Sequence, residues 1–305
     1  MELETLTIKR AMEDFFRHCR YERKLDEKTL SAYRVDLRQF TEDIGPNCSI
    51  CDISRDYLQA WLRRLEAYKP RTVKRKIASA RVFLHYLEVA YEWFENPFRR
   101  LQVRIKRPEC LPRVMTLSEM KRILEHLSNE TLASGNKVMC VRNRAVIELL
   151  FGTGMRIGEL CGLRNEDVDL VEGRVRIHGK GNRERVVDIG PMQTLDALRV
   201  WARVRTTSEE AAAWFFTNRL GNVLAPQSVR SMVHELCRQC HIGKDVTPHM
   251  FRHTFASLLL EEDVDVTYIQ HILGHSSIAT TQIYLHVNPC RQREILRRHH
   301  PRGRM

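Results

Sequence analysis

The stretch Thr247-Pro248-His249-Met250-Phe251-Arg252-His253 decides how the rest of this chain is interpreted. Threonine followed by proline is typical of a helix start, with a capping hydroxyl and a ring that fits the first turn. On such a helix His249 and Arg252 lie on one face, so both side chains can reach one bound phosphate. His253 falls on a different face, and we expect it to have a structural role.

Two further groups follow this helix within a short length of chain. His275 lies 23 residues after Arg252, and Tyr284 lies nine residues after His275. Gly274 is typical of the residue that ends a helix, and it would direct His275 out of a helix ending at Leu273. A lone histidine or tyrosine at such positions is usually a surface or packing residue. Their spacing from the preceding helix favours a part in phosphate chemistry instead.

A second arginine comes from the upstream stretch Thr153-Gly154-Met155-Arg156-Ile157-Gly158-Glu159-Leu160. Thr153 is expected to be an N-cap, which would place Arg156 in the first helical turn, where the backbone field also favours an anion. Glu159 lies one helical turn further on and would brace Arg156. A plain surface ion pair is the alternative for these two side chains.

A lysine stands between these two regions, in His178-Gly179-Lys180-Gly181-Asn182-Arg183. The glycines and asparagine predict a turn that joins strands at 174–178 and 183–189 into a hairpin. A lysine at a hairpin tip usually serves only solubility. A flexible ammonium there would nevertheless be able to enter beside a bound phosphate and protonate a departing 5′ oxygen.

These residue types together suit the cleavage of a DNA phosphodiester, which needs a nucleophile, charge stabilisation and a proton for the leaving oxygen. Tyr284 is the candidate nucleophile, and its phenol needs help to lose its proton at neutral pH. Arg156 and Arg252 would hold the two non-bridging oxygens, because guanidinium stays charged and matches phosphate geometry. No group of carboxylates with metal-ligand spacing accompanies them, so we expect catalysis by fixed cations without a metal ion.

Composition favours a polyanionic partner. The 305 residues carry a formal net charge of +12, with 43% hydrophobic and 29% charged residues, as in soluble globular proteins of ordinary domain size. No apolar run is long enough to span a bilayer, and the N-terminus is unlike a signal peptide, so DNA is favoured over a membrane surface. Nine cysteines without an export signal indicate reduced thiols and a cytoplasmic protein. We interpret the Cys48/Cys51 and Cys237/Cys240 pairs as structural rather than as haem or zinc sites.

The chain is predicted to form two domains, both mainly helical. Residues 1–102 show four amphipathic helices, the third opening at Ser54 and the fourth following Pro70. Prolines and basic residues predict a linker at 103–113. The second domain, 114–290, starts with a capped helix at Thr116-Leu117-Ser118-Glu119, contains the hairpin, and looks helical throughout after about residue 191. Residues 291–305 form an arginine-rich tail.

The fourth predicted helix carries a basic face opposite its apolar one, made of Arg71, Lys74, Arg75 and Lys76. Such faces are usually only solvated. Because the whole chain is basic, we expect this one to contact the DNA backbone.

In order and spacing, Arg156, Lys180, His249, Arg252, His275 and Tyr284 resemble the catalytic set of the tyrosine recombinase, or phage integrase, family. The contexts Thr-Gly-x-Arg-x-x-Glu-Leu and His-x-x-Arg-His-x-x-Ala fit as well, and the likeness covers nearly the whole chain. It is greatest to simple two-domain Xer-type recombinases. The resemblance implies a mainly α fold: a four-helix, SAM-like core-binding domain and a mostly helical catalytic domain with a small antiparallel β-sheet.

The resemblance also implies a mechanism. Tyr284 would form a 3′-phosphotyrosyl link and exchange strands through a Holliday junction, without metal or ATP. His249 would accept a proton, Lys180 would act as general acid, and Arg156, Arg252 and His275 would stabilise the transition state. Partners would be double-stranded sites with inverted half-sites and a homo-tetramer, or a hetero-tetramer with a related recombinase, joined through the tail.

Two alternatives stay open on the sequence alone: a type IB topoisomerase-like enzyme that reseals the original strand, and a non-catalytic DNA-binding regulator. Dimer resolution, integration or excision, and inversion are the biological roles open to such a recombinase.

Overall fold

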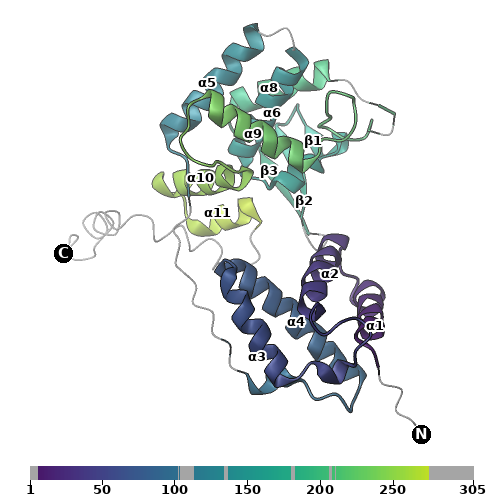
Figure 1. Cartoon of the computed structure of the whole chain (residues 1–305). Coiled ribbons are helices and arrows are strands. Elements are labelled where there is room, and N and C mark those ends of the chain that lie inside the picture. The colour runs from purple at the N-terminus through teal and green to yellow at the C-terminus, as the bar shows by residue number, and fades with distance from the viewer. Residues whose placement is uncertain are drawn as a thin grey trace, which may run out of the picture. The chain divides into compact units, whose positions relative to one another are not determined.

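The computed structural model describes residues 6–101, 103, 113–133, 137–179, 183–205, 208–209 and 211–274. The chain divides into two compact units, residues 1–109 and 110–305, and each is described by itself (Figure 1). The division falls inside the segment predicted as a linker, whose exact limits stay a prediction.

The N-terminal unit contains the four expected helices, α1 Ile8–Tyr21, α2 Glu27–Thr41, α3 Arg55–Arg64 and α4 Pro70–Ala90. Short 3₁₀ turns lie at Ile50–Asp52, Leu65–Ala67 and Pro97–Arg100. Side-chain caps begin two of the helices. At α2 the Asp26 carboxylate accepts the backbone N–H of Thr29 at 2.8 Å, and at α3 the Ser54 hydroxyl accepts that of Tyr57 at 3.2 Å.

Aromatic side chains fill the core of this unit. Phe15 of α1 meets Phe83 of α4 edge-on, with ring centroids 5.3 Å apart, and Phe40 of α2 meets Trp61 of α3 in the same way at 4.8 Å. Because each contact joins two helices, the aromatic residues fix how the four helices pack.

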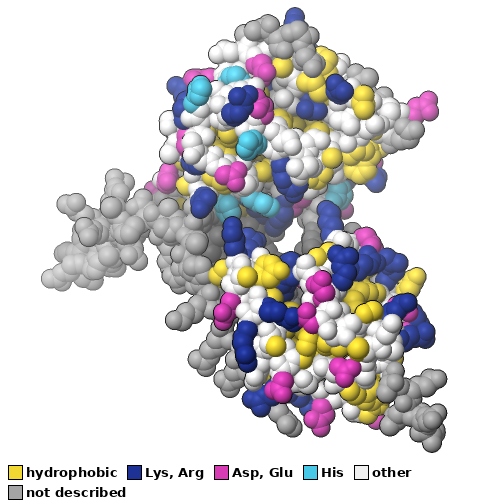
Figure 2. Space-filling view, viewed as in Figure 1, with side chains coloured by type: hydrophobic (Ala, Val, Ile, Leu, Met, Phe, Trp, Pro, Cys, Tyr) yellow, Lys and Arg dark blue, Asp and Glu magenta, His cyan; other side chains and the backbone are white. Residues whose placement is uncertain are grey.

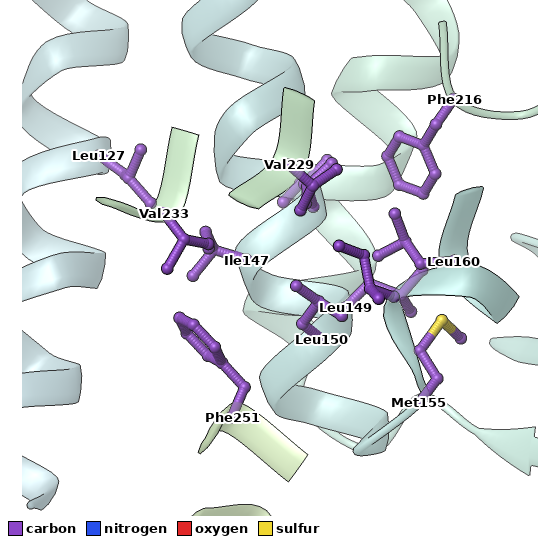
Figure 3. Packing of buried hydrophobic residues seen from close by; sticks show 14 of the residues in the cluster. Leu127, Ile147, Leu149, Leu150, Met155, Leu160, Phe216, Val229, Val233 and Phe251 are labelled. Atoms are coloured by element: carbon purple, nitrogen blue, oxygen red, sulfur yellow. The ribbon is translucent and has the colours of Figure 1, made fainter. Parts of the chain in front are cut away.

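The C-terminal unit is also mainly helical. Its helices are α5 Leu117–Ala133, α6 Lys137–Thr153, α7 Ile157–Cys161, α8 Met192–Val204, α9 Pro226–Gln239, α10 Pro248–Glu261 and α11 Val266–Leu273. A 3₁₀ turn spans Asn165–Asp167. Helix α6 forms the centre, since every residue from 145 to 150 is buried, and Figure 3 shows Ile147, Leu149 and Leu150 among residues from other elements. Buried residues lie on every side of this part of α6, which explains its weak amphipathic pattern.

A small antiparallel sheet has the strand order β1-β2-β3, with β1 Val168–Asp169, β2 Arg174–Gly179 and β3 Arg183–Asp188. The pairing of Val175 with Val187 and of Ile177 with Arg185 sets the register of the β2–β3 hairpin. The hairpin was expected, whereas the two-residue strand β1 was too short to produce an alternating pattern.

The helical prediction for the segment that follows α8 is wrong. Residues 205–225 were expected to be helical, but the described part of this segment runs in turns. Isolated bridges pair Trp214 with Arg164 and Thr217 with Val223. Phe215 and Phe216 are buried there by contacts with distant elements, and such contacts override local helix propensity.

Within the described parts of the chain, no helix is both long and apolar enough to cross a membrane.

Candidate functional site

Arg156 stands at the start of α7, not inside its first turn. Thr153 is the last residue of α6, where its hydroxyl donates to the carbonyl of Leu149 at 2.6 Å, so the predicted cap at Thr153 is wrong. Helix α6 continues through Thr153, whose side chain is fully buried. Gly154 then adopts a positive φ of 60° and turns the chain, and Arg156 becomes the N-cap residue of α7.

Glu159 holds Arg156 in two ways. One carboxylate oxygen accepts the backbone N–H of Arg156 at 2.8 Å, and the other accepts an N–H of its guanidinium, also at 2.8 Å. The Glu159 side chain is only 7% exposed, so the simple surface ion pair is excluded. Burial alone would raise the pKa of this carboxyl, but the hydrogen bonds from Arg185 and Arg156 outweigh burial and lower the pKa.

Arg185, on strand β3, is a member of this cluster that the sequence analysis missed. Its two terminal nitrogens donate to the two oxygens of Glu159 at 3.1 and 2.8 Å, and its Nε donates to the carbonyl of Ile272 at 3.0 Å. Strand alternation carried a signal for it, because Arg185 occupies the same inward-facing register as the buried Val187 and Ile189. A charged residue at an inward position calls for a buried partner.

Arg252 of α10 is 4% exposed and connects two other parts of the site. Its guanidinium donates to the carbonyl of Gly154 at 2.9 Å and to that of Leu273 at 2.7 Å. Gly154 lies two residues before Arg156, and Leu273 lies two residues before His275. The guanidinium therefore fixes the backbone on both sides of the predicted site.

His249 lies in the first turn of the same helix and is exposed. Thr247 occupies the N-cap position without a side-chain capping bond, and Pro248 opens the helix as predicted. His253 is half-buried; burial first, then the nearby His249 and Arg252, lower its pKa. These features agree with an accessible His249 and a packed His253.

Helix α11 ends as the sequence predicted. Gly274 is its C-cap in the left-handed conformation, with φ 63° and ψ 47°. A Cβ placed on Gly274 would lie 3.0 Å from Cδ of Arg185, so the helix end packs closely against the side chain from β3. Lys180, His275 and Tyr284 lie outside the described residues, as does the predicted tail at 291–305.

The base of the hairpin is held by His178. Its Nε2 lies 2.8 Å from the buried carboxylate of Asp167, and its Nδ1 lies 3.1 Å from the carboxylate of Glu184. The hydrogen bond with Asp167 is the main cause of a raised His178 pKa, with a further contribution from Glu184. The His178 imidazole therefore ties both strands to the preceding turn.

The basic face predicted on α4 is only partly exposed. Arg71, Lys74 and Arg75 are exposed, but Lys76 is 4% exposed and its ammonium donates to Gln39. Lys76 also lies 3.9 Å from the buried Asp36, so its assignment to a DNA-facing surface is corrected. Burial is the main reason that the pKa of Lys76 is lowered. Figure 2 shows basic and acidic side chains mixed on the visible face of this unit.

The cysteine pairs differ in environment. Cys48 and Cys51 are exposed, whereas Cys237 and Cys240 are buried, and burial raises the pKa of Cys237 to about 11. Within the parts of the chain that the structure covers, no group of three or more His, Cys, Asp or Glu side chains is arranged to hold a metal ion.

Comparison with known proteins identifies the class. Residues 113–291 match the phage integrase family, and residues 12–90 match the phage integrase N-terminal SAM-like domain. A tyrosine recombinase of Agathobacter rectalis is 40% identical over 94% of this chain and 95% of its own length. The chain therefore belongs to the phage integrase family, and it is a tyrosine-type site-specific recombinase that acts on DNA.

Within that family the Xer-type resemblance is confirmed. The tyrosine recombinase XerC of Halalkalibacterium halodurans is 33% identical over 95% of this chain and 96% of its own length. The fold matches a crystal structure of the XerH site-specific recombinase bound to a palindromic difH substrate in a post-cleavage complex. That match has a TM-score of 0.74 and 22% identity, and it covers 92% of this chain and 82% of the other.

Proposed function

We propose that this recombinase cleaves one DNA strand with Tyr284 and rejoins it to a partner strand through a Holliday junction. The phenolic oxygen of Tyr284 attacks the scissile phosphorus, the bond to the 5′ oxygen breaks, and a 3′-phosphotyrosyl link forms. His249 accepts the phenolic proton, and Lys180 supplies a proton to the leaving 5′ oxygen. Attack by the 5′ hydroxyl of a second strand reverses these steps and releases Tyr284. Because the phosphotyrosyl link preserves the energy of the phosphodiester, rejoining needs no ATP, and the fixed cations of the site take the place of a metal ion.

The charge that develops on the phosphoryl group is balanced by Arg156, Arg252 and His275. Removing one such preorganised donor costs an enzyme about 100- to 1,000-fold in rate. The observation that best supports this assignment is the placement of Arg252. Its guanidinium bonds to the backbone two residues before Arg156 and two residues before His275, so three separate segments converge on one guanidinium.

The assembly is proposed to be a tetramer on two DNA sites, each with inverted half-sites. A second, related recombinase is an alternative source of two of the four subunits. In this arrangement the N-terminal helices hold the DNA, with Arg71, Lys74 and Arg75 on phosphates, and residues 291–305 dock on a neighbouring subunit. The proposed setting is the cytoplasm, and the proposed role is dimer resolution or the integration and excision of a mobile element.

The test starts from sheared DNA of the source organism. Protein is incubated with the fragments and denatured, and the DNA that stays attached to protein is sequenced. We expect one short site with inverted half-sites. Two duplexes of that site, labelled with different dyes, should then yield chimeric strands. Resealed parental strands without chimeras would indicate a topoisomerase, and no attached DNA would contradict the proposed chemistry.

A further inference from the structure

Arg185 joins three parts of the candidate site: the hairpin to which it belongs, α7 and α11. It comes from β3, the strand that returns from the hairpin turn containing Lys180. Its guanidinium reaches Glu159 of α7 and the last turn of α11. The elements that flank Lys180, Arg156 and His275 thus meet at a single guanidinium.

The contact between Arg185 and Glu159 fixes the positions of both side chains, beyond the attraction of opposite charges. Both oxygens of the carboxylate are engaged by the fork of Arg185, and the two side chains are only 10% and 7% exposed. The same two oxygens bind the backbone N–H and the guanidinium of Arg156. Arg156 itself is 39% exposed, so its long side chain depends on the carboxylate for a fixed position.

The contact of Arg185 with α11 also fixes a position. Nε of Arg185 donates to the carbonyl of Ile272, and the side chain packs against Gly274, where even a methyl group would be crowded. This partly buried N–H to carbonyl bond holds the last turn of α11 against strand β3. The position at which the chain leaves α11 toward His275 is therefore set by a residue of the hairpin.

We propose that Arg185 is a positioning residue for DNA cleavage: through Glu159 and the carbonyl of Ile272 it fixes Arg156 and the end of α11 against the hairpin. Arg185 does not itself touch the DNA. Loss of its side chain is expected to slow the cleavage step about 100-fold, the usual effect of a displacement of about 1 Å in a catalytic group. This inference rests on the proposed cleavage by Tyr284.

The test is single-turnover cleavage of a nicked suicide duplex carrying the mapped site, in which formation of the covalent adduct is followed over time. Arg185→Met removes the fork, and Arg185→Lys keeps a charge that can reach Glu159 without bridging both oxygens. We expect adduct formation to slow about 100-fold in the first variant and by an intermediate factor in the second. DNA affinity should stay within about threefold of the wild type, because no phosphate contact is removed.

A matched control is Arg174→Met on the same hairpin. Arg174 pairs with Asp188 at 3.0 Å, but both side chains are largely exposed, and its replacement should leave the rate unchanged. Thermal unfolding of each variant identifies any that do not fold. If Arg185→Met does not fold, the rate of Arg185→Lys is compared with that of the wild type.

Two further measurements separate positioning from mere stabilisation. If Arg185 acts through Glu159, Arg185→Met and Glu159→Gln should be strongly non-additive in rate when combined. A duplex with a neutral methylphosphonate at the cleaved position needs less cation, so the defect of Arg185→Met should shrink on it. The proposal is overturned if folded Arg185→Met cleaves at the wild-type rate or loses only DNA affinity. It is also overturned if the rate effects of Arg185→Met and Glu159→Gln are additive. Failure of the wild type to form an adduct would instead contradict the proposed function.

Discussion

Gly154 shows how strongly a single residue of the site is constrained. Its φ is positive, and a Cβ there would lie 2.6 Å from Cδ1 of Phe255 and 2.7 Å from Cδ2 of Leu273. Its carbonyl also accepts a hydrogen bond from Arg252. A side chain at this position would thus strain the backbone and push α10 and α11 apart.

Gly154→Ala is accordingly expected to lower the free energy of unfolding by about 2 to 4 kcal/mol, the sum of backbone strain and overpacking. Adduct formation should fall as well, because the anchor of Arg252 moves. Urea unfolding and the cleavage assay measure the two effects. The control is Gly158→Ala in α7, where nothing lies within 4 Å of the added methyl group and alanine should be neutral or slightly stabilising. Equal stability of the two variants would count against the close packing at Gly154.

His178 gives a pH-dependent prediction. Because Asp167 and Glu184 raise its pKa, the stability it contributes is fully present below its unfolded pKa of about 6.5 and is lost as pH rises through the folded pKa. His178→Gln should therefore destabilise the protein more at pH 5.5 than at pH 9. The effect should stay below about 1 kcal/mol, since the ring is half exposed.

The comparison uses urea unfolding at both pH values. In an Asp167→Asn background, which keeps an oxygen for the backbone N–H of Arg164, the pH dependence of the His178 effect should largely disappear. A pH dependence of full size in that background would show that Asp167 is not its source.

At the residue scale, the sequence was most informative where a local pattern connects residues that are close along the chain. Gly274 was predicted as a helix end because a left-handed C-cap favours glycine, and Glu159 was predicted to brace Arg156 because one helical turn separates them. Arg185 was missed because its partners are distant in sequence. Lys76 was misplaced because helical periodicity cannot reveal that Asp36 and Gln39 of α2 would bury it.

At the scale of elements, α4 carries basic residues in two different environments. Lys74 is exposed, whereas Lys76 packs inside the N-terminal unit against the ring of Tyr68, with its ammonium 4.9 Å from the ring centre. Only the first is free to reach a phosphate, so substitutions at the two positions should have different consequences.

Lys74→Ala should weaken binding to a fluorescent duplex of mixed sequence and lower the slope of log affinity against log salt by about 1. Lys76→Met should leave that slope unchanged while it alters the unfolding free energy, because it changes a buried contact with Asp36 and Gln39. Anisotropy titrations at several salt concentrations measure the slopes. An unchanged slope for Lys74→Ala would remove this residue from the proposed DNA surface.

The elements that could be predicted are those whose own sequence determines them. The N-terminal helices show apolar residues at steps of three and four. Side-chain caps begin α1, α2 and α3, and Pro70 begins α4. The hairpin has glycine on both sides of Lys180. The segment 205–225 could not be predicted, because its buried Phe215 and Phe216 are held by tertiary contacts such as the bond from the Trp201 indole to the Phe215 carbonyl at 2.9 Å. The end of α6 was likewise set by packing of its buried face.

For the whole molecule, the proposed chemistry needs only fixed cations and a tyrosine. Cleavage of the mapped site should continue in the presence of EDTA at a rate within about twofold of the rate with magnesium, since arginine and histidine supply the charge that a metal ion supplies elsewhere. Single-turnover assays with and without chelator decide this. An absolute requirement for a divalent ion in the cleavage step would contradict the mechanism.

The family, the two-domain organisation and the catalytic class follow from residues spread over the whole chain, which explains why the sequence alone indicated them. The parts of the site are held together by the contacts of Arg185 and by the hydrogen bonds from Arg252 to the carbonyls of Gly154 and Leu273. These contacts depend on three-dimensional packing and became visible only in the structure.

The most direct measurement is the identity of the residue that carries DNA after cleavage. Adduct formed on the mapped site is digested with protease and nuclease, and the nucleotide-bearing peptide is sequenced by mass spectrometry. We predict a nucleotide linked through its 3′ phosphate to Tyr284, and no adduct in Tyr284→Phe, which should still bind the site. Attachment to any other residue, or an adduct that persists in Tyr284→Phe, would contradict the assignment.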